Sequence, residues 1–135
     1  RNAKGCTLFF INTLAANDPD STEIILKNCM TQHYWLHKKY LLINNRADRL
    51  TRLEQYVSFT VKHQQLFDTI LISGENQQLF YKQLLRQRVD RAKIFMIRDE
   101  SYFDTLDCTA VIFAAGNICR SGKRLVEYFE QKHEG

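Results

Sequence analysis

Short apolar runs alternate with amphipathic segments along the whole chain. The apolar runs are rich in β-branched and aromatic residues, which is typical of buried strands. They predict strands over residues 6–12, 39–45, 69–74, 92–98 and 108–116. Between the runs, apolar residues recur every three or four positions, a spacing that predicts amphipathic helices. These helices are expected over residues 19–33, 46–63, 76–88 and 121–133.

The alternation of strand and helix predicts an α/β fold built from βαβ units. We expect a Rossmann-like, doubly wound, mostly parallel sheet of five or six strands with helices on both faces. In the predicted helix 46–63, apolar residues share one face: Leu50, Leu53, Val57 and Val61. No repeat, low-complexity tract or linker interrupts the pattern, so residues 1–135 are expected to form a single domain.

Composition narrows the classes of function. The chain has 135 residues, of which 44% are hydrophobic and 25% charged, as in an ordinary globular domain. The formal net charge of +4 fits an anionic ligand, but lysine and arginine are spread along the chain, so we expect no nucleic-acid partner. No apolar run approaches membrane-spanning length, and no signal peptide opens the chain. Because Arg1 is an unusual first residue, we expect a piece of a longer protein.

The cysteines give no sign of a metal or disulfide framework. They are Cys6, Cys29, Cys108 and Cys119. They form no CxxC pair and lie near no histidine at zinc-ligand spacing, so we interpret them as reduced thiols of a cytosolic protein and expect no metal site.

In open α/β sheets, ligands bind at the carboxyl ends of the strands, in the loops that lead into helices. The first such loop here is NTLAANDPDS, residues 12–21. Asp18 and Pro19 are typical of an N-cap and a first helical residue. Asn12 and Asn17 have no such explanation. Asn17 is either an Asx-turn residue or a ligand contact.

Basic residues follow the second predicted strand. Arg46, Arg49 and Arg52 lie at the start of the next helix, where positive charge opposes the helix macrodipole unless an anion compensates it. Arg46 and Arg49 can share one helix face, so they form a candidate clamp for a carboxylate or phosphate. The alternative is a solvated basic turn, partnered by Asp48 and Glu54.

The last predicted strand leads into the loop AAGNICRSG, residues 114–122. Gly116 allows either a sharp turn or the close approach of a ligand, and Ser121 is expected to cap the final helix. The spacing from Gly116 to Lys123 is one residue too long for a Walker P-loop, and no predicted strand is followed by GxGxxG.

Three motifs of this chain resemble one known family. FINTLAANDPDST (10–22), NNRADR (44–49) and GNICRSGKRLVEYF (116–129) resemble the C-terminal part of the ligase subunit of poly-γ-glutamate synthase. That family belongs to the Mur ligase superfamily, together with the folylpolyglutamate synthetases. Its chains are expected to have an N-terminal part, a central P-loop ATPase and a C-terminal Rossmann-like domain. The resemblance, from Phe10 to Phe129, implies that this chain is the third part alone and closes over a separate P-loop domain.

The resemblance also implies a reaction. Such ligases use ATP and Mg²⁺ to activate a carboxylate as an acyl phosphate, which an incoming amino group attacks to give an amide. In poly-γ-glutamate synthesis, which serves capsule biosynthesis, the substrates are glutamate and the growing γ-linked chain. ATP and Mg²⁺ would be held mainly by the central domain, so this chain alone would be inactive. Small membrane subunits of the synthase are implied partners, with a cytoplasmic location peripheral to the inner face of the cell membrane.

The same resemblance assigns ligand contacts to this chain, but no catalytic residue and no metal ligand. Nucleotide contacts are implied for Asn12, Asn17 and Asp18. Substrate contacts are implied for Arg46, Arg49, Asn76, Gly116, Asn117 and Arg120. The residues alone leave a second hypothesis open, a free-standing nucleotide- or anion-binding α/β module without catalysis.

Overall fold

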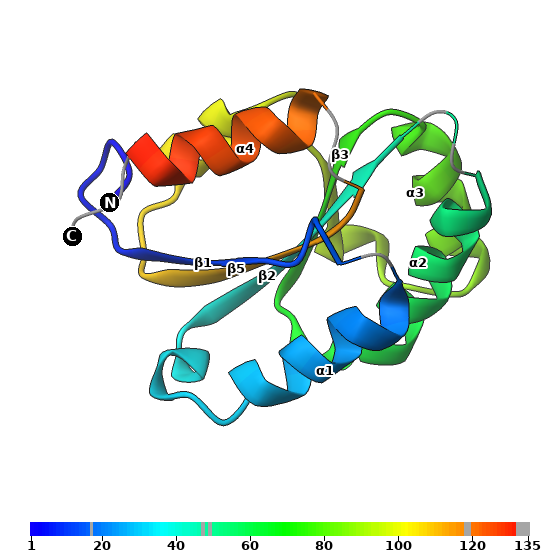
Figure 1. The fold of residues 1–135 in the computed structure, drawn as a ribbon, viewed down its shortest axis with the longest axis horizontal. Coiled ribbons are helices and arrows are strands. Elements are labelled where there is room, and N and C mark those ends of the chain that lie inside the picture. The colour runs from blue at the N-terminus through cyan, green and yellow to red at the C-terminus, as the bar shows by residue number, and fades with distance from the viewer. Residues whose placement is uncertain (17, 47, 49, 118–119, 132–135) are drawn as a thin grey trace.

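The computed structural model describes residues 1–16, 18–46, 48, 50–117 and 120–131 (Figure 1). Its centre is a parallel sheet of five strands in the order β1-β5-β2-β3-β4. The strands are β1 (Leu8–Asn12), β2 (Lys38–Asn45), β3 (Thr69–Gly74), β4 (Ile94–Met96) and β5 (Ala110–Gly116). The α-helices described are α1 (Pro19–Cys29), α2 (Leu50–His63), α3 (Gln77–Arg86) and α4 (Arg120–Gln131).

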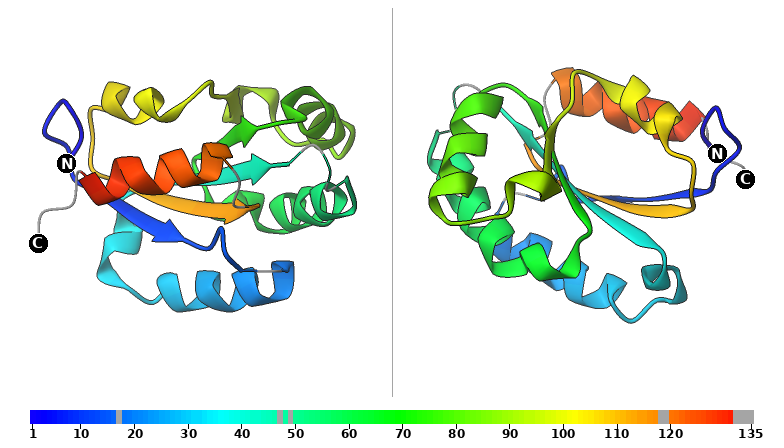
Figure 2. Two further views of the ribbon diagram at one scale, coloured as in Figure 1. Left: turned by 45° about the horizontal axis from the view of Figure 1, so that its top comes forward. Right: turned by 180° about the vertical axis from the view of Figure 1, so that it is seen from behind.

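The helices lie on both faces of the sheet, as the alternation of strand and helix predicts. Helices α1, α2 and α3 pack on one face, where their apolar residues form one core cluster with the sheet. Helix α4 packs on the opposite face, and Figure 2 shows it across the sheet from α1. The predicted Rossmann-like, doubly wound α/β fold is therefore confirmed.

The strand β2 shows how the core is divided between the two faces. Leu41 and Ile43 belong to the cluster beneath α1, α2 and α3, whereas Tyr40 and Leu42 belong to the cluster beneath α4. All four side chains are at most 3% exposed. Because both faces of this central strand are covered, its sequence is a continuous apolar run rather than an alternating one.

Some predicted boundaries are wrong. The helix predicted over 19–33 ends at Cys29, and a separate 3₁₀ helix follows at His33–Leu36. The strand predicted over 92–98 contains only Ile94–Met96. This strand is at the edge of the sheet and pairs with β3 alone. Because no second strand of the described chain pairs with its other side, only a short segment is held in the sheet.

The predicted buried face of α2 is wrong at its first position. Leu53 and Val57 are buried and Val61 packs against the core, but the side chain of Leu50 is 53% exposed. Because α2 begins at Leu50, this residue lies in the first turn, beyond the end of β2.

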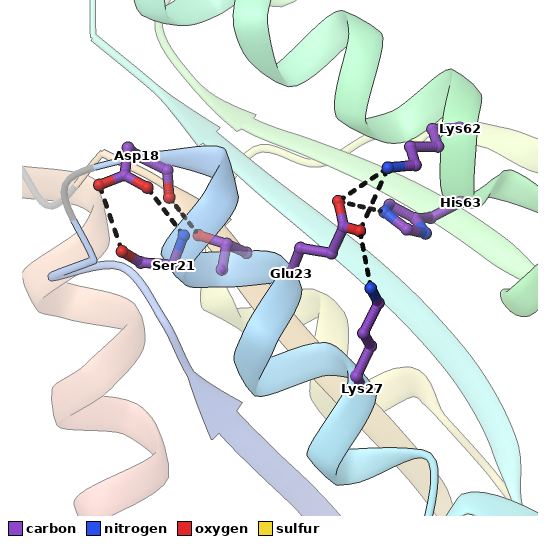
Figure 3. A network of polar contacts seen from close by, with 7 residues as sticks. Asp18, Ser21, Glu23, Lys27, Lys62 and His63 are labelled. Carbon is purple, nitrogen blue, oxygen red and sulfur yellow. Dashed lines mark hydrogen bonds and ion pairs between the residues drawn. The ribbon is translucent and has the colours of Figure 1, made fainter.

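A charged cluster joins α1 to α2 (Figure 3). The carboxylate of Glu23, in α1, lies 3.1 Å from Lys62 Nζ and 3.3 Å from His63 Nε2, both at the end of α2. Lys27, one turn further along α1, adds a third contact at 3.3 Å. The contact with Lys62, followed by those with Lys27 and His63, lowers the pKa of Glu23 from its ordinary value of 4.5 to about 2. The cluster thus fixes α1 against α2 and, with it, the loop at the start of α1.

We expect this cluster to make stability depend on acid pH. A carboxyl group whose pKa is lowered by folding stabilises the fold above its unfolded value and loses that contribution as pH falls through its folded value. The free energy of unfolding should therefore decrease as the pH falls from 4.5 to 2. In the Glu23→Gln variant, the free energy of unfolding should decrease less over this range. Urea unfolding at a series of pH values measures this, with Glu54→Gln, at an exposed position of α2, as the control. Equal pH dependence in wild type and Glu23→Gln would contradict the assignment.

Candidate functional site

The carboxyl ends of the parallel strands meet along one side of the sheet, which we call the carboxyl edge. It comprises the ends of β1, β5, β2 and β3 and the loops that follow them. Asn44 of β2 lies between Gly116 of β5 and Ser73 of β3, and Asn45 lies beside Gly74. The register therefore brings the loops that contain Arg46 and Asn117 onto neighbouring strands, although they are far apart in sequence.

Asn44 joins three elements at the carboxyl edge. Its side chain is fully buried. Nδ2 donates to the backbone oxygen of Asn117 at 2.7 Å, and Oδ1 accepts from the hydroxyls of Ser73 at 2.8 Å and Ser121 at 3.0 Å. These bonds tie β2 to β3, to the loop after β5 and to the first turn of α4. Asn44 is missing from the predicted site residues; its only sequence signal is an amide at the end of an apolar run.

Two glycines flank the end of β2. Gly116 has φ +106°, and a Cβ added there would lie 2.3 Å from the backbone oxygen of Asn44. Gly74, on the other side, has φ +81° and would place a Cβ 2.4 Å from the backbone oxygen of Asn45. Gly116 is therefore required for a sharp turn and for close backbone packing; a substrate contact at Gly116 stays a prediction.

The loop between β1 and α1 contains the predicted nucleotide contacts. Asp18 is the N-cap of α1 and accepts a hydrogen bond from the backbone N–H of Ser21 at 2.7 Å, as its position before Pro19 predicts. This bond is the largest cause that lowers the pKa of Asp18, and Arg52 makes a smaller contribution. The exposed Asn12 closes a turn by accepting from the backbone N–H of Leu14 at 3.0 Å. The predicted contact at Asn17 lies outside the described residues.

Behind this loop, buried hydroxyls connect α1 to α2. The hydroxyl groups of Thr22 and Tyr56 lie 2.9 Å apart, and both side chains are at most 1% exposed. Burial is the main cause that raises the pKa of Tyr56, and hydrogen bonds from Thr22 and the backbone of Gly116 oppose it. Helix α1 and the end of β5 therefore both contact Tyr56 of α2.

Arg46 presents its guanidinium group at the start of the β2–α2 loop. Its Nε and Nη2 atoms donate to the two carboxylate oxygens of Asp48, at 3.0 and 2.9 Å. The Arg46 side chain is 35% exposed and that of Asp48 is 65% exposed, so both are accessible to solvent. The partnership with Asp48 that the basic-turn alternative expects is thus present. The fork geometry is also the one in which arginine binds a carboxylate of a ligand. Arg49 lies outside the described residues.

The remaining predicted contacts lie at two places along the carboxyl edge. Asn76 begins the turn into α3 with φ +56° and lines a shallow cavity of about 820 Å³ between the ends of β3 and β4, together with Gly74, Gln77, Gln78, Leu79, Met96, Ile97 and Arg98. Asn117 is 7% exposed, and its backbone N–H donates to the oxygen of Asn44 at 2.8 Å. The side chain of Arg120 lies outside the described part of the structure.

The prediction that Ser121 caps the last helix is wrong. Helix α4 begins one residue earlier, at Arg120, so Ser121 lies inside its first turn. The Ser121 hydroxyl donates to Asn44 Oδ1 instead of capping the helix. Sequence alone could not show this, because the acceptor is 77 residues away in the chain.

A second cavity, of about 640 Å³, follows the outer side of β1 beneath α4. Its lining comes from the β1 region and from α4, and comprises Arg1, Thr7, Leu8, Phe9, Phe10, Asn12, Val126, Tyr128, Phe129 and Glu130. Most of these residues lie along the strand rather than at its carboxyl end. We therefore do not include this cavity in the candidate site.

The described residues contain no group of three or more His, Cys, Asp or Glu side chains placed to hold a metal ion. Cys6, Cys29 and Cys108 are free thiols, and Cys119 lies outside the described residues. Among the described helices, none has the length and apolar character needed to span a membrane.

Comparison with known proteins finds the same family that the sequence motifs resemble. Residues 1–132 match the family model of the poly-gamma-glutamate synthase CapB C-terminal domain. The chain belongs to this family. It is 27% identical over 124 residues to the PGA synthase CapB of Bacillus subtilis (strain 168), covering 87% of this chain and 31% of that protein. The CapB C-terminal domain described here thus spans about a third of the length of that relative.

The fold of the CapB C-terminal domain is also found in a solved ligase. The UDP-N-acetylmuramate-alanine ligase MurC of Thermotoga maritima superposes with a TM-score of 0.55 at 13% sequence identity. The superposition covers 93% of this chain and 27% of that one. At this identity the likeness concerns the fold alone, and it supports the Rossmann-like architecture of the domain.

Proposed function

We propose that this chain is the C-terminal domain of an ATP-dependent ligase that joins glutamate through amide bonds into poly-γ-glutamate. In this proposal the domain closes over a separate P-loop ATPase domain, which holds most of the ATP and Mg²⁺. The membership in the CapB C-terminal family supports the proposal, as does the coverage of only 31% of the relative. The function belongs to the complete protein, and this chain supplies binding and orientation rather than a catalytic residue.

The observation that carries the proposal is the Arg46 fork at the carboxyl edge. It holds the carboxylate of Asp48 through both oxygens, in a position that solvent reaches. Surface ion pairs of this kind contribute about 0–1 kcal/mol to stability, so a substrate carboxylate can replace Asp48 at small cost. A glutamate substrate carries such a carboxylate beside the reacting amino group. We infer that Arg46 orients that group.

The other loops of the edge have complementary tasks in this proposal. The N-terminus of α1, with Asp18 and Asn12 in the preceding loop, faces the nucleotide. The loop after β5 is held against β2 by Asn44, so Asn117 keeps a fixed position toward the polymer. The carboxylate to be joined would be activated by ATP in the central domain as an acyl phosphate. The incoming amino group, oriented by this domain, would then attack it.

The partners follow from the same proposal. Glutamate, poly-γ-glutamate and ATP are the ligands, and small membrane subunits of the synthase would bring the enzyme to the inner face of the cell membrane. The domain itself would be cytoplasmic and peripheral. The competing hypothesis, an anion-binding module without catalysis, predicts that the complete protein forms no amide.

A direct assay separates the two hypotheses. The complete protein and the 135-residue chain are each incubated with ATP, Mg²⁺ and labelled glutamate, and released phosphate and γ-linked product are measured. We expect the complete protein to release phosphate in proportion to amide formed, and the isolated chain to release none. ATP turnover by the purified chain would contradict the need for a separate P-loop domain. Absence of amide product from the complete protein would contradict the ligase proposal itself.

A further inference from the structure

Asn45, the last residue of β2, has a buried side chain with an unused donor. The side chain is 1% exposed, and its Nδ2 group has no hydrogen-bond partner. The backbone of the same residue takes part in the sheet beside Gly74, and its oxygen accepts from the N–H of Glu75 at 3.0 Å. The neighbouring Asn44 differs, since both atoms of its side-chain amide are bonded.

A buried donor without a partner is destabilising and uncommon in native proteins. Among the described residues, the only other buried side-chain nitrogen or oxygen without a hydrogen bond is His63 Nε2, which lies 3.3 Å from the carboxylate of Glu23. A leucine of similar shape would fill this position without that cost, so a purely structural role does not account for the amide.

The position of Asn45 places this donor within the candidate site. Side chains alternate along a strand, and Asn44 points toward α4, where it meets Ser121. Asn45 therefore points to the opposite face, the one covered by α1, α2 and α3. Asn45 ends β2 and directly precedes Arg46, and the chain then leads into the N-terminus of α2. An anion at this helix N-terminus would be favoured by the macrodipole and by the guanidinium group.

We propose that Asn45 is a ligand-contact residue of the carboxyl edge, whose Nδ2 donates to an anionic oxygen of the bound substrate. This inference rests on the proposed function. The oxygen belongs either to a carboxylate of glutamate or poly-γ-glutamate or to a phosphate of ATP, and the amide binds both in the same way. In the structure this donor is covered and has no partner. The anionic oxygen of the substrate would supply the partner.

The test compares two buried asparagines that differ in hydrogen bonding. Asn2 is 6% exposed, and its Nδ2 donates to the oxygens of Phe103 at 2.7 Å and Leu106 at 2.8 Å. Asn45→Leu should leave the melting temperature of the 135-residue chain unchanged or raise it by a few degrees. Asn2→Leu should lower it by several degrees, because it leaves two buried carbonyls without donors.

The same variants are then introduced into the complete protein. Asn45→Leu should raise the KM for one substrate at least fivefold: for glutamate if the partner is a carboxylate, for ATP if it is a phosphate. Asn2→Leu should leave both KM values within twofold of wild type. Should Asn45→Leu fail to fold, Asn45→Asp keeps the shape of the side chain, replaces the donor by an anion and is expected to raise the same KM further.

Different results would contradict the ligase proposal and the proposed role of Asn45. If the complete wild-type protein forms no amide, the ligase proposal fails, and calorimetric binding of ATP and of a γ-glutamyl peptide to wild type and Asn45→Leu still decides the role of Asn45. If wild type is active or binds these ligands, but the Asn45 variants keep both KM values or affinities within twofold, the inference is overturned. A melting temperature of Asn45→Leu that falls as far as that of Asn2→Leu, with unchanged KM, would show a structural role only.

Discussion

Gly116→Ala is expected to destabilise the chain by about 3 kcal/mol or more, a large share of the roughly 5–15 kcal/mol by which a domain is stable. Two costs add at this position. A residue with a Cβ pays about 1–2 kcal/mol for the left-handed conformation that Gly116 adopts at φ +106°. The new Cβ would also lie 2.3 Å from the backbone oxygen of Asn44, and because that atom belongs to a central strand it cannot move without breaking strand pairing.

Gly5→Ala is the matched control for this prediction. Gly5 has a similar φ of +78°, but nothing lies within 4 Å of a Cβ added there. It should therefore show only the conformational cost, about 1–2 kcal/mol. Urea unfolding of both variants measures the difference. If Gly116→Ala and Gly5→Ala lose the same stability, the close packing between β5 and β2 does not constrain the loop, and the rigid position we assign to Asn117 would be wrong.

Most of the sheet could be predicted from sequence because its central strands are covered on both faces. Residues 69–74 form β3 as predicted, and β2 differs from its prediction by one residue. The edge strand β4 was predicted too long, since an apolar run does not show how far a neighbouring strand extends. The 3₁₀ helix at His33–Leu36 was not predicted, because a helix of only four residues is too short to show a repeating hydrophobic pattern in the sequence.

The candidate site was predicted only in outline. The N-cap at Asp18 depends on its immediate neighbours, so local sequence was sufficient. The roles of Asn44 and Asn45 depend on groups brought in from other strands, such as Ser73 and Ser121, and a single sequence does not show those contacts. The pairing of Arg46 with Asp48 is the one that the alternative of a solvated basic turn predicts. The implied contacts with nucleotide and substrate, including those at Asn76, Asn117 and Arg120, remain predictions.

Arg46→Ala is expected to have the largest effect on activity of the complete protein. A bidentate hydrogen bond between a guanidinium group and a carboxylate contributes about 1.5–3 kcal/mol, which corresponds to a roughly 10- to 100-fold change in binding. The KM for glutamate should rise by about this factor. Stability should hardly change, because the ion pair with Asp48 is exposed and such pairs contribute about 0–1 kcal/mol. Arg46→Lys should recover only part of the loss, since lysine cannot form the fork.

We propose that the carboxyl edge of this domain holds the acidic substrate of a ligase. The kcat/KM for glutamate, measured by ATP-dependent amide formation, tests it most directly when Arg46→Ala is compared with Arg91→Ala in the complete protein. Arg91 is an exposed arginine just before β4, at the opposite edge of the sheet. Our account predicts a loss of tenfold or more for Arg46→Ala and a change within twofold for Arg91→Ala. Equal activity of the two variants would show that glutamate is bound elsewhere and would contradict the account.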